Sequence, residues 1–312
     1  MRVVIDRYVP YVAQMLAPYM DVVALEPEAI TAEAVREADA LIVRTRTRVD
    51  ASLLASSRVR LVATATIGYD HIDTRYCEEH GIRWMACPGC NAQAVCDYVE
   101  EVLDEVKDTL PIHRIGVVGV GHVGSLVAEM ARRKGYEVCL NDPPKGIGVS
   151  LDEIAQTCDV ITFHTPLTKT GDWATYHLCN AALLNRCHPK TLIINAARGG
   201  VVDETALLAS GNPCVVDCWE NEPHINRELL SSTNTLLASF HIAGYSMEGK
   251  RNASQMCLTA LSEFFQIPHL PEIATDQEEQ GDNAAGWLQR VTEQLRENPD
   301  GFEQIRKQYK LR

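Results

Sequence analysis

Three side chains that could bind an anion or move a proton stand just after apolar runs in the second half of the chain. Arg198 follows the run "TLIINAA", Glu222 lies in "DCWENEP", and His241 follows "NTLLAS". The guanidinium of arginine keeps its proton, so an arginine at the edge of a core needs an anion or water as its partner. Histidine is the side chain best suited to exchange a proton near neutral pH. Each residue alone has a structural explanation, but together they predict an anion site beside an acid–base group.

A glycine-rich segment, "VVGVGHVG", predicts a dinucleotide site. Gly119, Gly121 and Gly124 form GxGxxG between an apolar run and a helical segment. The first glycine allows a tight turn, the second lets the backbone approach a pyrophosphate, and the third lets the helix pack on the strand. The N-terminus of that helix offers unpaired N–H groups to the phosphates. A glycine turn that serves packing alone is the alternative.

Asp142 indicates which dinucleotide is bound. It closes the next apolar run, 18 residues after Gly124, where a carboxylate accepts hydrogen bonds from an adenosine ribose. A carboxylate repels the 2′-phosphate of NADP, and no arginine follows Asp142 immediately. We therefore expect NAD rather than NADP.

Short apolar runs alternate with segments of helical spacing, which predicts alternating strands and helices and therefore parallel sheets. Five runs lie in residues 1–86 and six more lie in residues 114–239. The amphipathic segment 91–108 and the segment 246–265 predict two long helices. The expected fold class is α/β, with two doubly wound, Rossmann-like parallel-sheet domains that are joined by these helices and enclose a cleft.

The expected domain bounds follow from this pattern. Residues 1–90 form a substrate-binding domain to which the chain returns at about 247–270, and residues 91–246 form the NAD-binding domain. Residues 271–312 form a short C-terminal extension. In it "ATDQEEQGDN" predicts a loop, and four apolar residues recur at helical spacing, namely Trp287, Leu288, Val291 and Leu295.

Composition excludes several classes of protein. Acidic residues outnumber basic ones by 42 to 29, a net charge of −13, which argues against a nucleic-acid partner held through its phosphates. No apolar run reaches the roughly 18 residues of a membrane span, and the charged N-terminal segment "MRVVIDRYVP" argues against export. We therefore expect a cytoplasmic protein without a membrane partner, whose 11 cysteines are reduced thiols.

No metal site is expected. "CPGC" at 87–90 has CxxC spacing, with Cys77 and Cys96 near it in sequence, but no second CxxC or paired histidine completes a zinc set. "DHID" at 70–73, His164 and His188 are interpreted as structural.

The segments "GVGHVG", "INAARGGVVD", "DCWENEP" and "FHIAG" resemble the successive signatures of the D-2-hydroxyacid dehydrogenases. Within that family, "LIVRTRTRVD", "TATIGYDHID", "CPGCNAQAV", "NDPP", "TFHTPL" and "HIAGYSMEGK" are similar to a branch that oxidises 4-phospho-D-erythronate in the synthesis of pyridoxal phosphate (vitamin B6). The resemblance runs from residue 1 to about residue 270. It implies NAD as cofactor and a phosphorylated hydroxy acid as substrate.

The resemblance also implies roles for individual residues. His241 would take the hydroxyl proton as hydride leaves C2 for NAD, Glu222 would orient His241, and Arg198 would clamp the substrate carboxylate. Substrate contacts are expected from Thr45, Thr66 and Tyr245. Cofactor contacts are expected from Gly119, Gly121, His122, Val123, Gly124, Asp142, Thr165, Ala196, Ala197, Arg198, Asp217 and Gly244.

Several alternatives remain open at this point. Arg44, Arg46 and Arg48 alternate, so in an extended segment they would project to one side; one or more could meet the phosphate, or they form a solvated basic edge. The family's branch has a larger dimerisation domain, so the short segment 271–312 implies a homodimer, or else an amphipathic tail folded on its own chain. The substrate could be another D-2-hydroxy acid such as phosphoglycerate, and a non-catalytic NAD-sensing protein is a further alternative.

Overall fold

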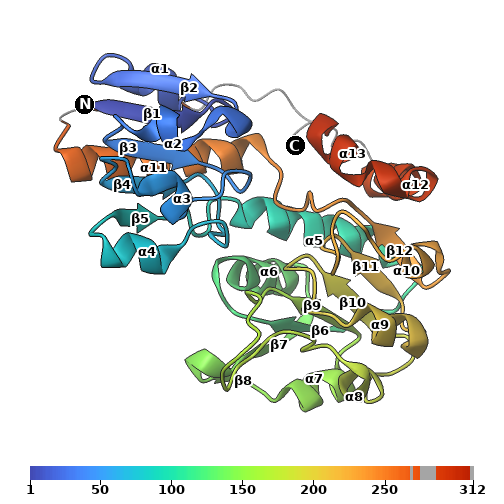
Figure 1. Cartoon of the computed structure of the whole chain (residues 1–312). Coiled ribbons are helices and arrows are strands. Elements are labelled where there is room, and N and C mark those ends of the chain that lie inside the picture. The colour runs from blue at the N-terminus through green and yellow to red at the C-terminus, as the bar shows by residue number, and fades with distance from the viewer. Residues whose placement is uncertain (268–269, 275–285, 310–312) are drawn as a thin grey trace. The chain divides into compact units, whose positions relative to one another are not determined.

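The computed structural model describes residues 1–267, 270–274 and 286–309, and its contacts divide the chain into two units. The first unit comprises Met1–Asn91 and Ser246–Glu279, and the second comprises Ala92–Tyr245 and Gln280–Arg312. Figure 1 labels the elements of both.

The first unit is built on a five-stranded parallel sheet with the strand order β2-β1-β3-β4-β5. Its strands are β1 (Arg2–Asp6), β2 (Asp21–Leu25), β3 (Ala40–Val43), β4 (Leu61–Thr64) and β5 (Arg83–Met85). Its helices are α1 (Val12–Leu16), η1 (Pro27–Ala29), α2 (Ala32–Val35), α3 (Ala51–Leu54), α4 (Thr74–Glu79) and α11 (Met247–Phe265).

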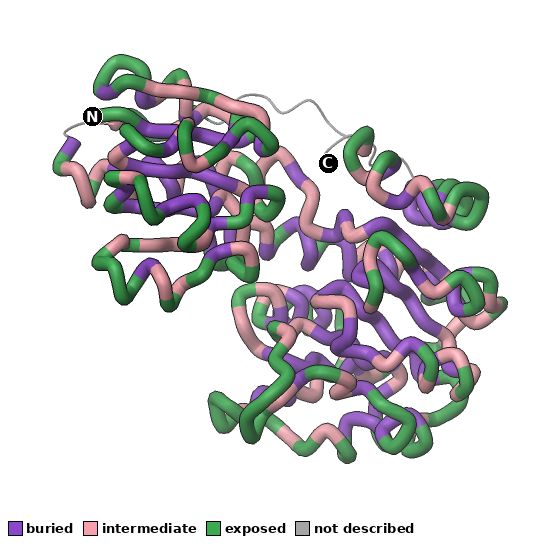
Figure 2. Tube along the Cα trace, viewed as in Figure 1, coloured by how far each residue is buried: buried purple, intermediate pink, exposed green. Residues whose placement is uncertain are grey.

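Helices cover both faces of this sheet, because successive side chains of a strand point to opposite faces. On one face Val3 and Ile5 pack in a cluster with residues of α1 and α11, and on the other Val4 packs with residues of α2, α3 and α4. This explains why β3 is apolar throughout and β4 is apolar up to its last residue, Thr64: both faces of each strand are buried (Figure 2).

The second unit is built on a seven-stranded sheet with the order β12-β11-β10-β9-β6-β7-β8. Its strands are β6 (Arg114–Val118), β7 (Glu137–Asp142), β8 (Ile147–Gly148), β9 (Val160–Phe163), β10 (Leu192–Asn195), β11 (Cys214–Val216) and β12 (Thr235–Ala238). Its helices are α5 (Ala92–Val106), α6 (His122–Arg133), η2 (Pro143–Lys145), α7 (Leu151–Thr157), α8 (Ala181–Leu184), α9 (Glu204–Ser210), α10 (Arg227–Ser231), α12 (Trp287–Glu297), η3 (Pro299–Gly301) and α13 (Phe302–Gln308).

The strand order of the second unit reverses between β6 and β9, which makes their carboxyl ends the expected ligand crevice of a doubly wound sheet. The prediction of an α/β fold with two parallel sheets is confirmed. β8 was not expected; it has two residues, pairs antiparallel with β7 and lies outside any apolar run.

The C-terminal segment packs on the second unit of its own chain. Trp287, Leu288, Val291 and Leu295 lie on α12 as predicted, and all four are buried in the core of this unit. Apart from Ala274, the expected loop 274–283 lies outside the described residues. In the described part of the chain, no helix is both long and apolar enough to cross a membrane.

Candidate active site

Three neighbouring parallel strands of the second unit bring the predicted acid–base residues to one sheet edge. β10, β11 and β12 lie side by side in the sheet. Arg198 follows β10, Glu222 follows β11 and His241 follows β12. The carboxyl ends of parallel strands face the same edge, so all three residues belong to the edge where ligands of such sheets bind.

Glu222 and His241 are in direct contact. Nδ1 of His241 lies 2.9 Å from Oε2 and 3.1 Å from Oε1 of Glu222. A carboxylate accepts hydrogen bonds only, so Nδ1 carries the proton of the neutral imidazole and Nε2 is left with its lone pair. Oε1 of Glu222 also accepts the backbone N–H of Trp219 at 2.8 Å, which fixes the carboxylate. The geometry gives His241 the tautomer that a general base requires.

The surroundings raise the pKa of His241 well above 6.5. Burial by itself lowers this pKa, but the neighbouring Cys218 sulfur and the Glu222 carboxylate outweigh it. Burial also raises the pKa of the Cys218 thiol to about 11, so that thiol is neutral at physiological pH. Glu222 is therefore the partner that stabilises the imidazolium there.

The backbone at His241 is held in the left-handed region, with φ of 60°. Asp217, which is buried, anchors the residues around it: its backbone oxygen accepts the His241 N–H at 2.9 Å. Its carboxylate accepts the N–H groups of Ile242 at 2.7 Å and Ala243 at 3.1 Å, and the Ser239 hydroxyl at 2.7 Å. Asp217 was expected to contact the cofactor; in this structure its carboxylate organises the loop that carries His241.

Arg198 lies on a turn that two other residues fix. Asn195, at the end of β10, donates from its side-chain amide to the backbone oxygens of Arg198 at 3.1 Å and Cys218 at 3.0 Å. A side chain at Gly199 would overlap the backbone oxygen of Trp219, so glycine permits the close approach of the two turns. Asn195 and Gly199 together hold the turn that carries Arg198 beside the turn that leads to Glu222.

The guanidinium of Arg198 is partly exposed and bonds the backbone oxygen of Ala197 at 2.7 Å. Within the described ranges, no carboxylate pairs with it. A permanently charged group with its ion-pairing capacity unused at a ligand edge is suited to an anion from solution.

The glycine-rich turn after β6 has the geometry that a dinucleotide requires. Gly119 has φ of 88°, and a side chain there would press on the His164 backbone. A side chain at Gly124 would overlap the Gly119 carbonyl oxygen, whereas one at Gly121 would point into open space. Gly121 precedes α6 as its N-cap, followed by His122 and Val123. This open space before a helix N-terminus fits an approaching pyrophosphate.

Asp142 ends β7 and Thr165 follows β9, at the carboxyl edge that also bears the glycine turn after β6. Asp142, at the end of β7, accepts the backbone N–H of Val120 at 2.9 Å and lies 3.6 Å from the Lys145 ammonium. The buried Thr165 hydroxyl, beside Gly119, has no hydrogen-bond partner among the residues that the structure describes. A buried unsatisfied hydroxyl at a ligand edge needs a partner from outside the chain. The residues present therefore fit NAD, with Ala196 and Ala197 buried at the same edge and Gly244 partly exposed after His241.

His164, also beside Gly119, is neutral: burial lowers its pKa to about 3. Its Nε2 lies 3.0 Å from the Thr162 hydroxyl. Nδ1 of His164 has no hydrogen-bond partner among the described residues, as is also true of the Thr165 hydroxyl, so the structural role of His164 stays a prediction.

The predicted substrate residues fall in both units. Tyr245 is partly buried in the second unit, where its backbone N–H bonds the Ile242 oxygen. In the first unit Thr45 is exposed after β3, and the Thr66 hydroxyl after β4 donates to the Gly68 oxygen at 2.8 Å and lies 2.7 Å from the Thr64 hydroxyl.

The arginines around Thr45 do not lie on an extended segment. Residues 45–47 form a turn, in which the Thr47 N–H bonds the Arg44 oxygen, so the expected projection to one side is wrong. Arg44 pairs with the buried Asp6 at 2.9 Å, and Arg48 pairs with Asp50 at 2.7 Å. Arg46 is exposed and has no ion pair among the described residues.

Sequence reasoning missed Asn195 and Glu204, which act on the backbone of the site. Glu204, buried at the start of α9, accepts the Glu220 N–H at 2.6 Å and so supports the turn that carries Glu222. Burial raises the pKa of Glu204 to about 7. Asn195 lies within the segment "INAARGGVVD" and Glu204 follows it directly, but the motif does not indicate these contacts; only the buried position of a polar side chain beside a strand end could have marked them.

The cysteines form no disulfide: all eleven are free, and Cys87 and Cys90 of "CPGC" are buried in the first unit. One group of three potential metal ligands occurs in the described part of the chain, namely Cys218, Glu222 and His241. Two of its members already bond each other, so we interpret the group as the acid–base pair with a neighbouring thiol.

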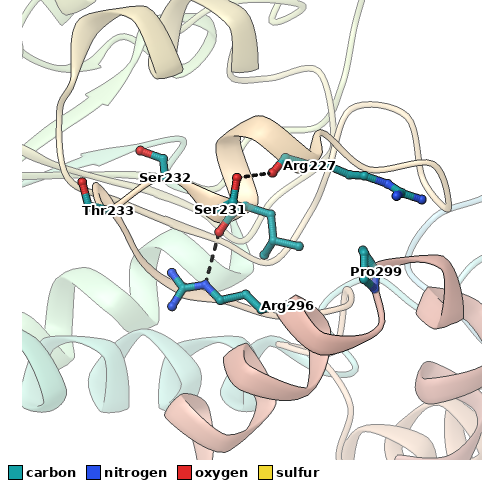
Figure 3. Close-up of a pocket in the computed structure, with 7 residues that line it drawn as sticks. Arg227, Ser231, Ser232, Thr233, Arg296 and Pro299 are labelled. Atoms are coloured by element: carbon teal, nitrogen blue, oxygen red, sulfur yellow. Dashed lines mark hydrogen bonds between the residues drawn. The ribbon is translucent and has the colours of Figure 1, made fainter.

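A separate cavity of about 440 Å³ lies in the second unit between α10 and α12 (Figure 3). Two polar residues of its lining are already engaged by the fold. Arg296 donates to the backbone oxygens of Leu230 at 3.2 Å and Thr235 at 2.6 Å, and the Ser231 hydroxyl bonds the Arg227 oxygen at 2.8 Å. The cavity does not contain the acid–base residues and is not the candidate site.

Comparisons with known proteins show the family of the chain. Residues 100–243 match the family model described as "D-isomer specific 2-hydroxyacid dehydrogenase, NAD binding domain". An erythronate-4-phosphate dehydrogenase of Bacteroides fragilis (strain YCH46) is 42% identical, with 100% of this chain and 97% of the relative covered. An erythronate-4-phosphate dehydrogenase of Porphyromonas gingivalis (strain ATCC BAA-308 / W83) is 41% identical, with 85% of this chain and 76% of the relative covered.

Solved structures share the fold. An NAD⁺-bound 3-phosphoglycerate dehydrogenase of Entamoeba histolytica matches with a TM-score of 0.72 at 22% identity over 88% of this chain and 99% of that one. A D-lactate dehydrogenase of Aquifex aeolicus, complexed with NAD and lactic acid, matches with a TM-score of 0.68 at 23% identity over 85% and 95%. This chain therefore belongs to the D-isomer specific 2-hydroxyacid dehydrogenase family and contains that family's NAD-binding domain.

Proposed function

We propose that the chain oxidises 4-phospho-D-erythronate to 2-oxo-3-hydroxy-4-phosphobutanoate with NAD, a step in pyridoxal phosphate (vitamin B6) biosynthesis. The observation that carries the proposal is the Glu222–His241 pair, 2.9 Å apart, on the sheet edge that also bears Arg198. The two relatives named above, at 42% and 41% identity, support the choice of substrate.

In this mechanism each residue of the site has one task. Arg198 binds the substrate carboxylate and draws electron density from the C2 oxygen. Nε2 of His241 takes the hydroxyl proton while the C2 hydrogen departs with its electron pair, so that C2 and its oxygen form a carbonyl. Bound NAD supplies the hydride acceptor. Glu222 stabilises the imidazolium that results.

The test is NADH formation by the full chain with a panel of D-2-hydroxy acids. We expect 4-phospho-D-erythronate to give the highest kcat/KM, above 3-phosphoglycerate and D-lactate. A higher kcat/KM for 3-phosphoglycerate or D-lactate would show that the substrate assignment is wrong, while the proposed reaction, oxidation of a D-2-hydroxy acid with NAD, would stand. NAD binding without turnover of any acid would favour the alternative of an NAD-sensing protein.

Arg46 is the proposed contact for the substrate phosphate. Arg44 and Arg48 are engaged by Asp6 and Asp50, whereas Arg46 is exposed without an ion pair in the described ranges. We expect Arg46→Ala to raise KM for the phosphorylated acid about 10-fold or more, because a charged hydrogen bond contributes about 1.5–3 kcal/mol. Arg48→Ala, which removes the same charge, is the control and should change KM less than 3-fold. Equal effects of both variants would contradict the assignment.

NAD binding at the glycine turn predicts opposite outcomes for two alanine variants. Gly121→Ala should melt like the wild type, because its Cβ points into open space, yet lose NAD affinity by about 10-fold or more, because that space admits the pyrophosphate. Gly124→Ala should lower Tm, because its Cβ overlaps the Gly119 carbonyl oxygen. Calorimetric titration with NAD and thermal melts measure both; unchanged NAD affinity in Gly121→Ala would refute this cofactor site.

The Glu222–His241 pair predicts a pH shift. Oxidation needs neutral His241, so kcat/KM rises with pH through its raised pKa. Glu222→Gln removes the charge that stabilises the imidazolium, so the pKa of His241 falls and the acid limb moves to lower pH, while the maximal rate decreases. Reduction of the 2-oxo acid needs protonated His241, so kcat/KM for reduction falls as pH rises. In Glu222→Gln this alkaline limb should move to lower pH as well. If both pH limbs of Glu222→Gln stayed at their wild-type positions, Glu222 would not stabilise the imidazolium of His241.

Two finer assignments belong to the same proposal. We place the enzyme in the cytoplasm, and we propose a homodimer to which residues 271–312 contribute, as in the branch of the family that it resembles. In the described residues, α12 and α13 pack on their own chain, so the solution mass relative to 34.6 kDa per chain is the direct measurement.

A further inference from the structure

The C-terminal helix α13 reaches the acid–base pair. Nη1 of Arg306 lies 3.6 Å from Oε2 of Glu222, the same oxygen that lies 2.9 Å from Nδ1 of His241. Nη2 of Arg306 lies 3.1 Å from Oε1 of Glu303, one turn earlier on α13. The side chain of Arg306 is 22% exposed, so this ion pair is largely shielded from solvent. These contacts connect four side chains in a row, Glu303, Arg306, Glu222 and His241, in which acidic and basic groups alternate.

Packing fixes α13 and the preceding α12 (red in Figure 1) against the strand that leads to His241. The Thr292 hydroxyl of α12 accepts the N–H of Ala238 at 2.9 Å, at the end of β12, and lies 3.0 Å from the carbonyl oxygen of the same residue. Phe302 and Tyr309 pack edge-on against Phe240, the residue before His241, with ring centroids 6.5 Å and 5.7 Å away. The position of Arg306 relative to Glu222 is therefore built into the core of the second unit.

We propose that Arg306 is a positioning residue for the acid–base pair, which holds the Glu222 carboxylate toward His241 and balances its charge. The proposal rests on the proposed role of His241 as the base. The backbone N–H of Trp219 donates a hydrogen bond to Oε1 of Glu222, and the guanidinium of Arg306 forms an ion pair with Oε2 of the same carboxylate. With both oxygens held, the carboxylate keeps the orientation in which it accepts the Nδ1 proton. The arginine does not touch the reacting atoms; it acts through Glu222.

The charge of Arg306 also limits how strongly Glu222 stabilises the imidazolium. Among the described residues, the charged or titratable groups linked to His241 directly or through a neighbour are Asp217, Cys218 and Glu222 after β11, Glu204 of α9, and Glu303 and Arg306 of α13. Arg306 is the cation that contacts Glu222; Arg198, on the same sheet edge, makes no ion pair with Glu222 in the described ranges. Removing its charge leaves the carboxylates unopposed, so the imidazolium becomes more stable and the pKa of His241 rises further. The base is then protonated over a wider pH range, and oxidation at neutral pH slows.

Three variants of the full chain test the proposal, with two readouts. Arg306→Met removes the charge, Arg306→Lys retains it, and Lys307→Met removes the same charge from the next, exposed residue of α13. The pKa of His241 is read by NMR from its ring resonances, assigned by their loss in His241→Asn. The acid limb of kcat/KM is measured on the same preparations.

We expect the pKa of His241 to rise by about half a unit to one unit in Arg306→Met, after allowance for partial solvent screening. In the same variant kcat/KM at pH 7 should fall about 3- to 10-fold and recover at higher pH. Arg306→Lys should restore most of both values, and Lys307→Met should match the wild type. A purely structural arginine would lower Tm in both Arg306 variants and leave the pKa and the acid limb in place, which would overturn the proposal.

The NMR readout separates this proposal from the proposed function. If the wild type turned over none of the acids in the panel, the function would fail while the pKa difference still decided the role of Arg306. An unchanged pKa of His241 in Arg306→Met overturns the positioning role whatever the turnover.

Discussion

His241→Asn is expected to reduce turnover of the hydroxy acid by about 10²- to 10⁴-fold, the usual effect of removing a general base. Asparagine is the replacement of choice because position 241 has φ of 60°, a conformation that asparagine tolerates better than alanine does. It cannot accept the proton as an imidazole does. The affinity for NAD should be nearly unchanged, because the glycine turn and Asp142 lie elsewhere on the sheet.

Three measurements on one preparation make this expectation sharp. They are kcat, the Kd for NAD and the thermal midpoint. A variant with wild-type kcat would exclude His241 as the base. A large loss of NAD affinity or of Tm would mean that His241 supports the fold or the cofactor site instead.

Arg198→Lys should lower kcat/KM for the hydroxy acid by about 10²-fold, although the positive charge is retained. A lysine ammonium cannot make the planar, two-point contact with a carboxylate that a guanidinium makes. The lost interaction is with a charged group and strengthens as charge develops on the substrate oxygen, so its loss costs about 3 kcal/mol. The Kd for NAD should move far less.

A structural bridge is the competing role for Arg198. In the structure its guanidinium bonds only the Ala197 backbone oxygen among the described residues, so a lysine should cost little stability. If Arg198→Lys lowered Tm while the folded enzyme kept its kcat/KM, Arg198 would be structural. A stable variant with unimpaired turnover would refute the carboxylate clamp.

The sequence was sufficient to predict the two parallel sheets and the sheet edge that bears the site. Parallel strands that are buried on both faces are mainly apolar, so β3, β4, β9 and β10 are visible in the sequence as short, mainly apolar runs. A polar residue in the loop that follows such a run lies at the carboxyl edge of the sheet. For that reason Arg198, Glu222 and His241 could be assigned to one edge before any distance was known.

Contacts made by backbone geometry or by distant segments could not be predicted in this way. The turn at residues 45–47 breaks the alternation of Arg44, Arg46 and Arg48, and Arg44 pairs with Asp6, which is far away in sequence. Asn195 and Glu204 form hydrogen bonds with backbone groups of Cys218 and Glu220, in the loop after β11. The spacing of residues in the sequence does not indicate which group a buried polar side chain will bond. Arg306 approaches Glu222 only because α13 packs on Phe240.

The central claim is that hydride leaves C2 of the acid for NAD while His241 takes the hydroxyl proton. The most direct measurement uses 4-phospho-D-erythronate that carries deuterium at C2, with NAD and the full chain in ordinary water. We predict that the deuterium appears in the NADH formed, detected by NMR, and that kcat/KM shows a primary isotope effect wherever the chemical step limits the rate. Deuterium lost to water, or retained in the acid while no NADH forms, would contradict the account.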